Sequence, residues 1–232
     1  MIYITGDRHR DFSFLPEFCN RYHTSTDDVL IILGDAAINF YDDRWKDRKL
    51  KKKIAKNPIT LLCIHGNHDK RPSNVPEYEE REWHGGIVYT EPEFPHILFA
   101  KDGEIYDFDG RKAMAIGGAR SSDMNYRLRY DLPWFPDEQP SPEIRKYVEE
   151  QLQKADWKTD YIFSHTVPYR FIPEEKLLMR TDQDGTDYTT EHWLDRIEER
   201  LTYQKWYAGH YHMEKKMGKL RIMYHEIDIL VN

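Results

Sequence analysis

The 232-residue chain carries 34 lysine and arginine residues against 41 aspartate and glutamate residues, a formal net charge of -7. Its 39% hydrophobic and 32% charged residues exclude low-complexity disorder and collagen-like sequence, and they are typical of a globular protein. An acidic surface repels a long polyanion, so we expect no long nucleic acid among its partners. The apolar runs are far shorter than the roughly 18 residues of a membrane span, so we also expect no membrane partner.

Only two cysteines occur, Cys19 and Cys63, and both lie inside apolar stretches. This placement predicts two buried thiols and no disulfide framework. Because disulfides are rare in the reducing cytoplasm, a cytoplasmic location is the simplest expectation. Met1 leads directly into a strand-like segment, so we expect no signal peptide.

Short apolar runs alternate with amphipathic stretches in the first part of the chain. The apolar runs predict strands over 1–5, 29–33 and 59–64, and the amphipathic stretches predict helices over 11–22 and 43–56. Fully apolar strands separated by helices are typical of parallel strands buried on both faces. An α/β fold is therefore expected.

Shorter and more closely spaced strand patterns follow, split by turn sequences such as Asp102-Gly103 and Asp109-Gly110. They predict an antiparallel meander over 87–90, 97–101, 104–108 and 112–116. The remaining patterns predict helices over 141–154 and 190–201 and strands over 160–163, 205–208 and 220–224. Ser141 followed by Pro142 is a typical helix start.

Two segments have no regular pattern. The segment 120–142 is rich in proline and aromatic residues and too long for an ordinary connection, so we expect it to overhang a site, with its role left open. Its aromatic side chains could stack on a substrate or pin the segment to the domain. The tail 226–232 fits either an extension of a sheet or an interface. Since no repeat or linker is visible, we expect one domain over residues 1–232.

Five polar clusters each follow the end of an apolar run. They are Asp7-Arg8-His9, Gly34-Asp35, Gly66-Asn67-His68-Asp69, Ser164-His165 and Gly209-His210-Tyr211-His212. In open α/β sheets, ligands bind beyond the carboxyl ends of the strands, so clusters at strand ends are expected to converge. Each cluster alone is commonly a turn or a surface pair. All five in one chain, at the same position relative to a strand, indicate one functional site.

The clusters offer carboxylate, amide and imidazole groups, a mixed set that suits Mn, Fe or Zn better than Ca or Mg. The set is large enough for two divalent cations with one shared carboxylate, so we expect a dinuclear site, with Mn2+ favoured and Fe or Zn as alternatives. Residues i and i+2 of an extended segment share a face, so the Asp-x-His and His-x-His pairs are each expected to clamp one ion. The glycines that precede three of the clustered residues allow close backbone approach.

With these motifs the sequence resembles the calcineurin-like metallophosphoesterase superfamily, whose signature is Asp-x-His, Gly-Asp, Gly-Asn-His-Asp/Glu, a single His and Gly-His-x-His. The resemblance extends from the first motif to the last and implies a four-layer α-β-β-α sandwich with two mixed β-sheets. It places the metal site at the carboxyl ends of the strands. The metal ligands that it implies are Asp7, His9 and His212 on the first ion, Asp35 as the bridge, and Asn67, His165 and His210 on the second ion.

One departure from the family pattern follows Gly34-Asp35. The chain continues with Ala36-Ala37-Ile38-Asn39, where many relatives have a further aspartate or an Asp-Arg pair. Asp35 itself is present, so we expect metal binding to be intact. The missing arginine is one that many protein phosphatase relatives use on the phosphate, so a protein phosphatase activity is disfavoured.

The expected reaction is hydrolysis of a small phosphoester, with a phosphodiester favoured, by attack of a metal-bridging hydroxide at phosphorus. The resemblance implies that His68 is the general acid. Asp69 could accept a hydrogen bond that keeps this imidazole charged and aimed at the leaving group. Arg8, Arg71 and Arg120 lie within or beside the motifs as candidate substrate contacts, although the side chain of Arg8 is expected to alternate away from the ligands beside it.

The motifs do not separate a phosphodiesterase from a phosphomonoesterase or a nucleotide pyrophosphohydrolase, so these alternatives stay open. A non-catalytic metal-binding scaffold of the same fold is less favoured, because no ligand and no acid is missing. A structural zinc site is disfavoured because such sites are rich in cysteine and neither cysteine lies near a motif. The expected partner is a small phosphoester or nucleotide substrate, and the oligomeric state is left open.

Overall fold

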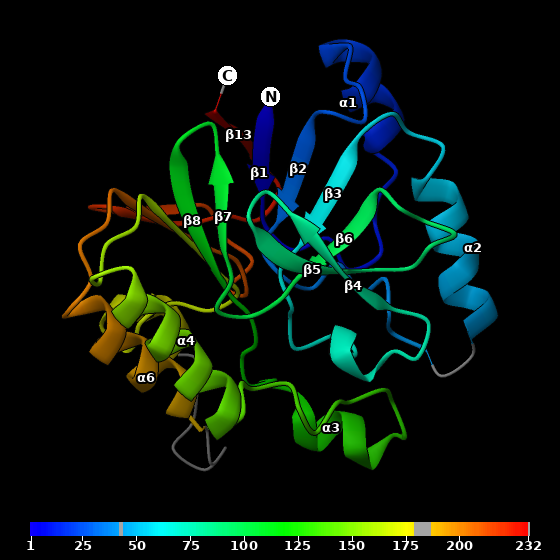
Figure 1. Cartoon of the computed structure of the whole chain (residues 1–232). Helices are drawn as coiled ribbons and strands as arrows, with labels where there is room; N and C mark the ends of the chain where they lie inside the picture. The colour runs from blue at the N-terminus through cyan, green and yellow to red at the C-terminus, as the bar shows by residue number, and fades with distance from the viewer. Residues whose placement is uncertain (42–43, 179–186, 232) are drawn as a thin grey trace.

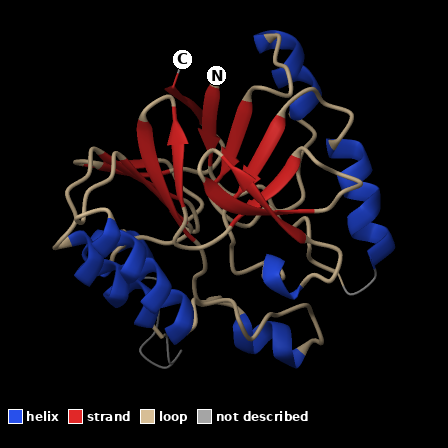
Figure 2. Ribbon diagram, viewed as in Figure 1, coloured by secondary structure: helices blue, strands red, loops and turns tan. Residues whose placement is uncertain are grey.

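Two mixed β-sheets packed face to face form the centre of the molecule (Figures 1 and 2). The computed structural model describes residues 1–41, 44–178 and 187–231. The larger sheet contains, in spatial order, β13 (Ile227–Val231), β1 (Ile2–Thr5), β2 (Val29–Ile32), β3 (Thr60–Cys63), β6 (Ile97–Ala100), β5 (Gly86–Thr90) and β4 (Glu79–Trp83). The four strands β1, β2, β3 and β6 are parallel, and the strands at both edges run antiparallel to their neighbours.

The smaller sheet repeats this arrangement. In spatial order it contains β11 (Lys215–Met217), β12 (Leu220–Ile222), β10 (Lys205–Ala208), β9 (Tyr161–Ser164), β8 (Arg111–Ile116) and β7 (Ile105–Phe108). Its central strands β12, β10, β9 and β8 are parallel, and β11 and β7 are antiparallel to them. The carboxyl ends of two sets of parallel strands are thereby available to build one site.

Helices cover the outer face of each sheet (Figure 2). The larger sheet is covered by α1 (Leu15–Tyr22) and α2 (Arg44–Ile54), and the smaller sheet by α4 (Pro142–Lys154) and α6 (Thr189–Glu198). The short helices are α3 (Met124–Arg129), α5 (Glu174–Leu178) and two 3₁₀ turns, Pro72–Asn74 and Tyr169–Phe171. Among the described residues, none of the helices is long and apolar enough to cross a bilayer.

Three hydrophobic clusters fill the three interfaces between these four layers. The central cluster joins the sheets, with Ile4 and Leu62 from the larger sheet packed in one group with Phe163 and Tyr207 from the smaller sheet. Two outer clusters join each sheet to its helices. Because the central strands are covered on both faces, nearly every residue in them is buried, which explains their unbroken apolar runs. The expected four-layer sandwich with two mixed sheets is confirmed.

The predicted antiparallel meander is wrong as a single unit. The pairs β5–β6 and β7–β8 are both antiparallel, but they belong to different sheets, and the chain passes from one sheet to the other through the turn at Asp102-Gly103. The Gly103 amide donates a hydrogen bond to the carbonyl of Ala115 in β8 at 2.8 Å, which ties this turn to the smaller sheet. The turn itself is therefore predictable from the sequence, but the change of sheet is not.

The ends of several elements differ from those predicted. Helix α1 begins at Leu15, because the Asp11 carboxylate accepts a hydrogen bond from the Ser13 amide at 3.0 Å and holds the preceding residues in a turn. The predicted start of α4 is confirmed, with Ser141 Oγ accepting from the amide of Ile144 at 3.3 Å. The tail forms β13, so it extends the larger sheet along β1.

We expect Leu62→Ala to lower the free energy of unfolding by about 2–5 kcal/mol, because this side chain is fully buried in the cluster between the sheets. Leu128→Ala, at a side chain that is 55% exposed, should change it by less than about 0.5 kcal/mol. Urea denaturation of both variants measures the difference. Equal effects would contradict the assignment of the main core to the interface between the sheets.

Candidate metal centre

The five polar clusters meet at one edge of the sandwich. Each follows the carboxyl end of a parallel strand: β1, β2 and β3 in the larger sheet, and β9 and β10 in the smaller sheet. The seven predicted ligand residues on these loops are Asp7, His9, Asp35, Asn67, His165, His210 and His212. Contacts between their side chains and backbone link the clusters of the two sheets, as expected from the positions of these clusters at strand ends.

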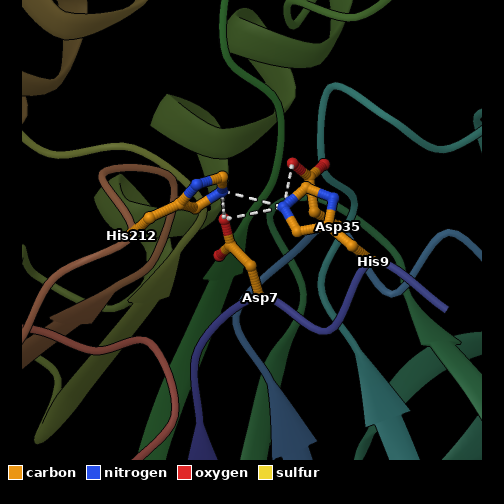
Figure 3. Close-up of side chains that lie close together, drawn as sticks. All are labelled: Asp7, His9, Asp35 and His212. Atoms are coloured by element: carbon orange, nitrogen blue, oxygen red, sulfur yellow. Dashed lines mark hydrogen bonds and ion pairs between the residues drawn. The ribbon is translucent and has the colours of Figure 1, made fainter. Parts of the chain in front are cut away.

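Four of these residues form a compact group of possible metal ligands, Asp7, His9, Asp35 and His212, whose ligand atoms all lie within 4.8 Å of one another (Figure 3). The Nε2 atoms of His9 and His212 are 2.8 Å apart, and His212 Nε2 lies 3.1 Å from Asp7 Oδ2. The hydrogen bond with Asp7 raises the pKa of His212. Two carboxylates and two imidazoles thus point toward a common point.

A second group of possible ligands faces the Asp35 carboxylate from the other side. His165 is fully buried, and its Nδ1 lies 2.8 Å from the Leu33 carbonyl. Since a carbonyl can only accept, Nδ1 donates to it, and this fixes the ring so that Nε2 faces Asn67 Oδ1, 2.8 Å away. Asn67 presents its oxygen there because its Nδ2 donates to Ser121 Oγ at 3.0 Å.

Asp35 lies between the two groups. Its Oδ2 is 3.8 Å from His9 Nε2, and its Oδ1 is 3.5 Å from His165 Nε2. Burial acts to raise the pKa of Asp35, but the neighbouring imidazoles of His165, His68 and His9 and the His68 amide together hold it below its usual value. The carboxylate is therefore kept ionised with one oxygen toward each group.

The donor set fits divalent cations. In the second group His165 Nε2 lies 2.8 Å from the acceptor Asn67 Oδ1, and in the first group two imidazole nitrogens approach to 2.8 Å, so neither pair is stable as two facing lone pairs. Such acceptor pairs repel unless a cation or a proton lies between them. Nitrogen and oxygen ligands of this kind suit Mn, Fe or Zn.

His210 contacts the site through both its backbone and its ring. Its amide donates to both carboxylate oxygens of Asp7, at 2.9 and 3.1 Å, and its ring centre lies 5.0 Å from that of His165. The structure therefore places the His210 ring beside the second group. Its role as a ligand stays a prediction.

The backbone argument for the Asp-x-His and His-x-His pairs is wrong. Strand β1 ends at Thr5, and His9 has a φ of 42°, so the pair does not lie on an extended segment. His210 and His212 also have positive φ values, 67° and 49°. The side chains converge because left-handed turns redirect them, with the His9 amide donating to the Asp35 carbonyl at 2.7 Å.

Two glycines allow the loops to approach this closely. A Cβ on Gly34, which has a φ of 94°, would lie 2.0 Å from His165 Nδ1. A Cβ on Gly209 would lie 2.1 Å from Asp7 Oδ1. Since side-chain atoms do not approach to such distances, the predicted need for glycine beside the predicted ligands Asp35 and His210 is confirmed at these positions.

His68 lies at the partly exposed edge of the site, and Asp69 is fully buried. The side chain of His68 is 14% exposed, with Nε2 4.0 Å from Asp35 Oδ2. Within the described residues no hydrogen bond joins the His68 ring to the Asp69 carboxylate, so the expected contact is absent. Burial and the nearby Asp35 charge raise the pKa of Asp69 well above its usual value. Its carbonyl lies 3.1 Å from His65 Nε2.

The three candidate substrate arginines have different surroundings. The Arg8 guanidinium contacts Thr5 Oγ1 and the carbonyls of Tyr224 and His225, away from the ligands beside it as expected. Arg71 pairs with Asp102 and donates to the carbonyl of Asp137. Both are buried and engaged, so contact with a substrate would require these partners to separate.

Arg120 is the half-buried member of this set. It follows β8, and its charge lies near the carboxylates of Glu138 and Asp187 and acts to lower their pKa values, but within the described part of the chain no hydrogen bond or close ion pair holds its side chain. The residue after it, Ser121, contacts Asn67 and is absent from the residues predicted from the sequence. The available signal was its place just beyond Gly117-Gly118 at the carboxyl end of β8, the same edge as the other clusters.

We expect Asp35→Asn to weaken Mn2+ binding, because it removes the charge that faces both groups of acceptor atoms. Metal-free wild type should show a higher melting temperature when Mn2+ is added, corresponding to about 2.7 kcal/mol at 100 times the Kd. The shift should shrink or vanish in Asp35→Asn. Asp27→Asn, at an exposed position, should retain it. A wild-type melting temperature that does not respond to Mn2+ would argue against the metal centre.

Structural comparison gives a fold-level likeness. A structure of TT1561 from Thermus thermophilus aligns with a TM-score of 0.51 and 12% sequence identity, over 96% of this chain and 87% of that one. A phosphopantetheinyl hydrolase from Mycobacterium tuberculosis aligns with a TM-score of 0.45 and 14% identity, over 96% of this chain and 87% of that one. The first likeness concerns the fold alone, and the second carries no argument about function.

No functionally curated protein gives a significant match to the sequence. The family model described as calcineurin-like phosphoesterase matches residues 1–231. This match covers all five polar clusters and both sheets. The chain therefore belongs to the calcineurin-like phosphoesterase family.

Proposed function

We propose that this protein is a metal-dependent hydrolase of small phosphoesters, with a phosphodiester as the favoured substrate and two divalent cations in its site. The observation that carries the proposal is the position of Asp35, with one carboxylate oxygen toward His9 and the other toward His165. A single carboxylate between two groups of acceptors is the arrangement that two neighbouring cations require.

Seven residues would hold the cations. Asp7, His9 and His212 face one side of Asp35, and Asn67 and His165 face the other, with His210 beside them. When bound, two such cations supply Lewis-acid activation of water and neutralise charge on the phosphate oxygens. Mn2+ is the favoured metal because the set mixes carboxylate, amide and imidazole groups.

His68 is proposed to deliver the proton to the leaving group. Its amide is fixed by a 2.8 Å hydrogen bond to Asp35 Oδ1, which anchors the residue at the rim while its ring remains partly exposed. Burial lowers the pKa of His68, and the Asp35 carboxylate opposes this effect. An imidazolium with a lowered pKa gives up its proton more readily, which favours departure of a poor leaving group.

Arg120 is the arginine that we assign to the phosphate. Its guanidinium is not occupied by a hydrogen bond within the described residues, unlike those of Arg8 and Arg71. The net charge of -7 disfavours a long polyanion and leaves short nucleotides and other small esters as candidates.

The proposal is tested by a paired assay on the purified protein with Mn2+ present. An aryl phosphodiester and the matching monoester are compared, and Asp35→Asn serves as the blank. Faster cleavage of the diester supports a phosphodiesterase, and faster cleavage of the monoester would overturn the diester preference. Cleavage of neither ester above the blank, although Mn2+ binds, would point to a non-catalytic scaffold.

His68→Ala should slow hydrolysis of an alkyl phosphodiester by about 10²–10⁴-fold and that of an aryl diester much less, because only the poor leaving group needs the proton. Mn2+ affinity should be unchanged. His192→Ala, at an exposed position on α6, is the matched control and should behave as wild type. If the alkyl and aryl esters were slowed equally, His68 would not be the acid.

A further inference from the structure

We propose that Ser121 is a positioning residue, which orients the side chain of Asn67 toward the metal centre and couples the segment 120–142 to that centre. The inference rests on the proposed metal-dependent function. It gives the unassigned segment a specific role, which is to set the affinity for one of the two cations.

The first step concerns the two orientations of the Asn67 amide. Asn67 is buried, its Nδ2 donates to Ser121 Oγ at 3.0 Å, and its Oδ1 lies 2.8 Å from His165 Nε2. When the His165 ring is neutral, a flipped amide would instead donate Nδ2 to Nε2, because the single ring hydrogen is on Nδ1 and is donated to the Leu33 carbonyl. The flipped amide would form a hydrogen bond with His165, but it would turn Asn67 Oδ1 away from the site and occupy the lone pair of His165 Nε2. Neither atom could then bind a cation.

The second step concerns the direction of the Ser121 hydroxyl. A serine hydroxyl can either donate or accept, so it selects one amide orientation only if its own hydrogen is directed elsewhere. The buried Glu138 carboxylate lies beside it and accepts from the Ser121 amide at 3.0 Å. Burial raises the pKa of Glu138, while the Ser121 hydroxyl and amide oppose that rise by hydrogen bonding. Since a carboxylate can only accept, a hydroxyl hydrogen directed at Glu138 leaves the lone pairs of Ser121 Oγ for Asn67 Nδ2, which lies 3.0 Å away.

The third step connects the rest of the segment. Glu138 Oε2 accepts from the indole Nε1 of Trp134 at 2.9 Å, and the Glu138 carbonyl accepts from the amide of Ala119 at 3.2 Å. These bonds join the end of the segment to its start. Helix α3 lies between these two ends in the chain. Because Glu138 also accepts from the Ser121 amide, a change that displaces Glu138 is expected to weaken the contact of Ser121 with Asn67.

Coupling of this kind is reciprocal. If an ordered segment raises the affinity for a cation, the bound cation must stabilise the ordered segment by the same free energy. Trypsin can report this effect, because Arg129 lies exposed at the end of α3. The segment should therefore be cut more slowly when Mn2+ is bound.

The experiment measures Mn2+ binding to metal-free protein by calorimetry, together with the rate of tryptic cleavage in the segment with and without Mn2+. Ser121→Ala should weaken one of two Mn2+ sites by about tenfold, the lower end of the usual effect of removing a partner of a metal ligand. It should also abolish the protection from trypsin by Mn2+. Ser121→Thr, which keeps the hydroxyl, should restore both.

Ser122→Ala is the matched control, because Ser122 is the exposed neighbour. It should bind Mn2+ and be protected as wild type. If Ser121→Ala does not fold, Glu138→Gln serves as the second variant, and it should weaken the same site because it replaces one of the two oxygens that accept from Ser121 and Trp134 with an NH2 donor. Unchanged Mn2+ affinity in either folded variant would overturn the inference. Absence of Mn2+ binding to wild type would instead overturn the proposed function.

Discussion

The hydrogen bond from His165 Nδ1 to the Leu33 carbonyl is the contact on which the site depends. Leu33 follows β2 in the larger sheet, and His165 follows β9 in the smaller sheet, so this fully buried bond joins the carboxyl ends of both sheets. It also fixes the orientation of the ring, and thereby turns Nε2 toward Asp35 and Asn67. One interaction therefore links the loops of the two sheets and orients a residue of the second group.

The site gains its inward-facing ligands at the expense of backbone strain. His9, Asp35, His210 and His212 all have positive φ, a conformation that costs non-glycine residues on the order of 1–3 kcal/mol each. Such strain persists only where the surrounding structure determines the conformation. Here the His210 amide donates a hydrogen bond to the Asp7 carboxylate, and the His9 amide donates one to the Asp35 carbonyl. The apolar core between the sheets supplies the stability that offsets the strain in these turns.

Much of the fold could be predicted from the sequence, because the central strands are buried on both faces and read as unbroken apolar runs. Strand β4 escaped prediction because Glu79–Trp83 is mostly charged and exposed, and only backbone pairing with β5 makes it a strand. The sequence could place the polar clusters at the strand ends. It could not predict the left-handed turns that direct their side chains toward one another. The surroundings of Arg8 and Arg71 and the contact of Ser121 with Asn67 depend on residues far away in the sequence, so no local pattern reports them.

The order of the ligands along the chain has a consequence for how the protein assembles. His9 and His212, which face each other in the site, are 203 positions apart, and β1 pairs on its outer side with β13 near the far end of the chain. A chain emerging from the ribosome holds only scattered ligands until both sheets are nearly complete. Because contacts of this range form late and slowly, cations bound at this site would not nucleate folding as they do in small zinc domains. They would instead stabilise chains in which both sheets have already formed.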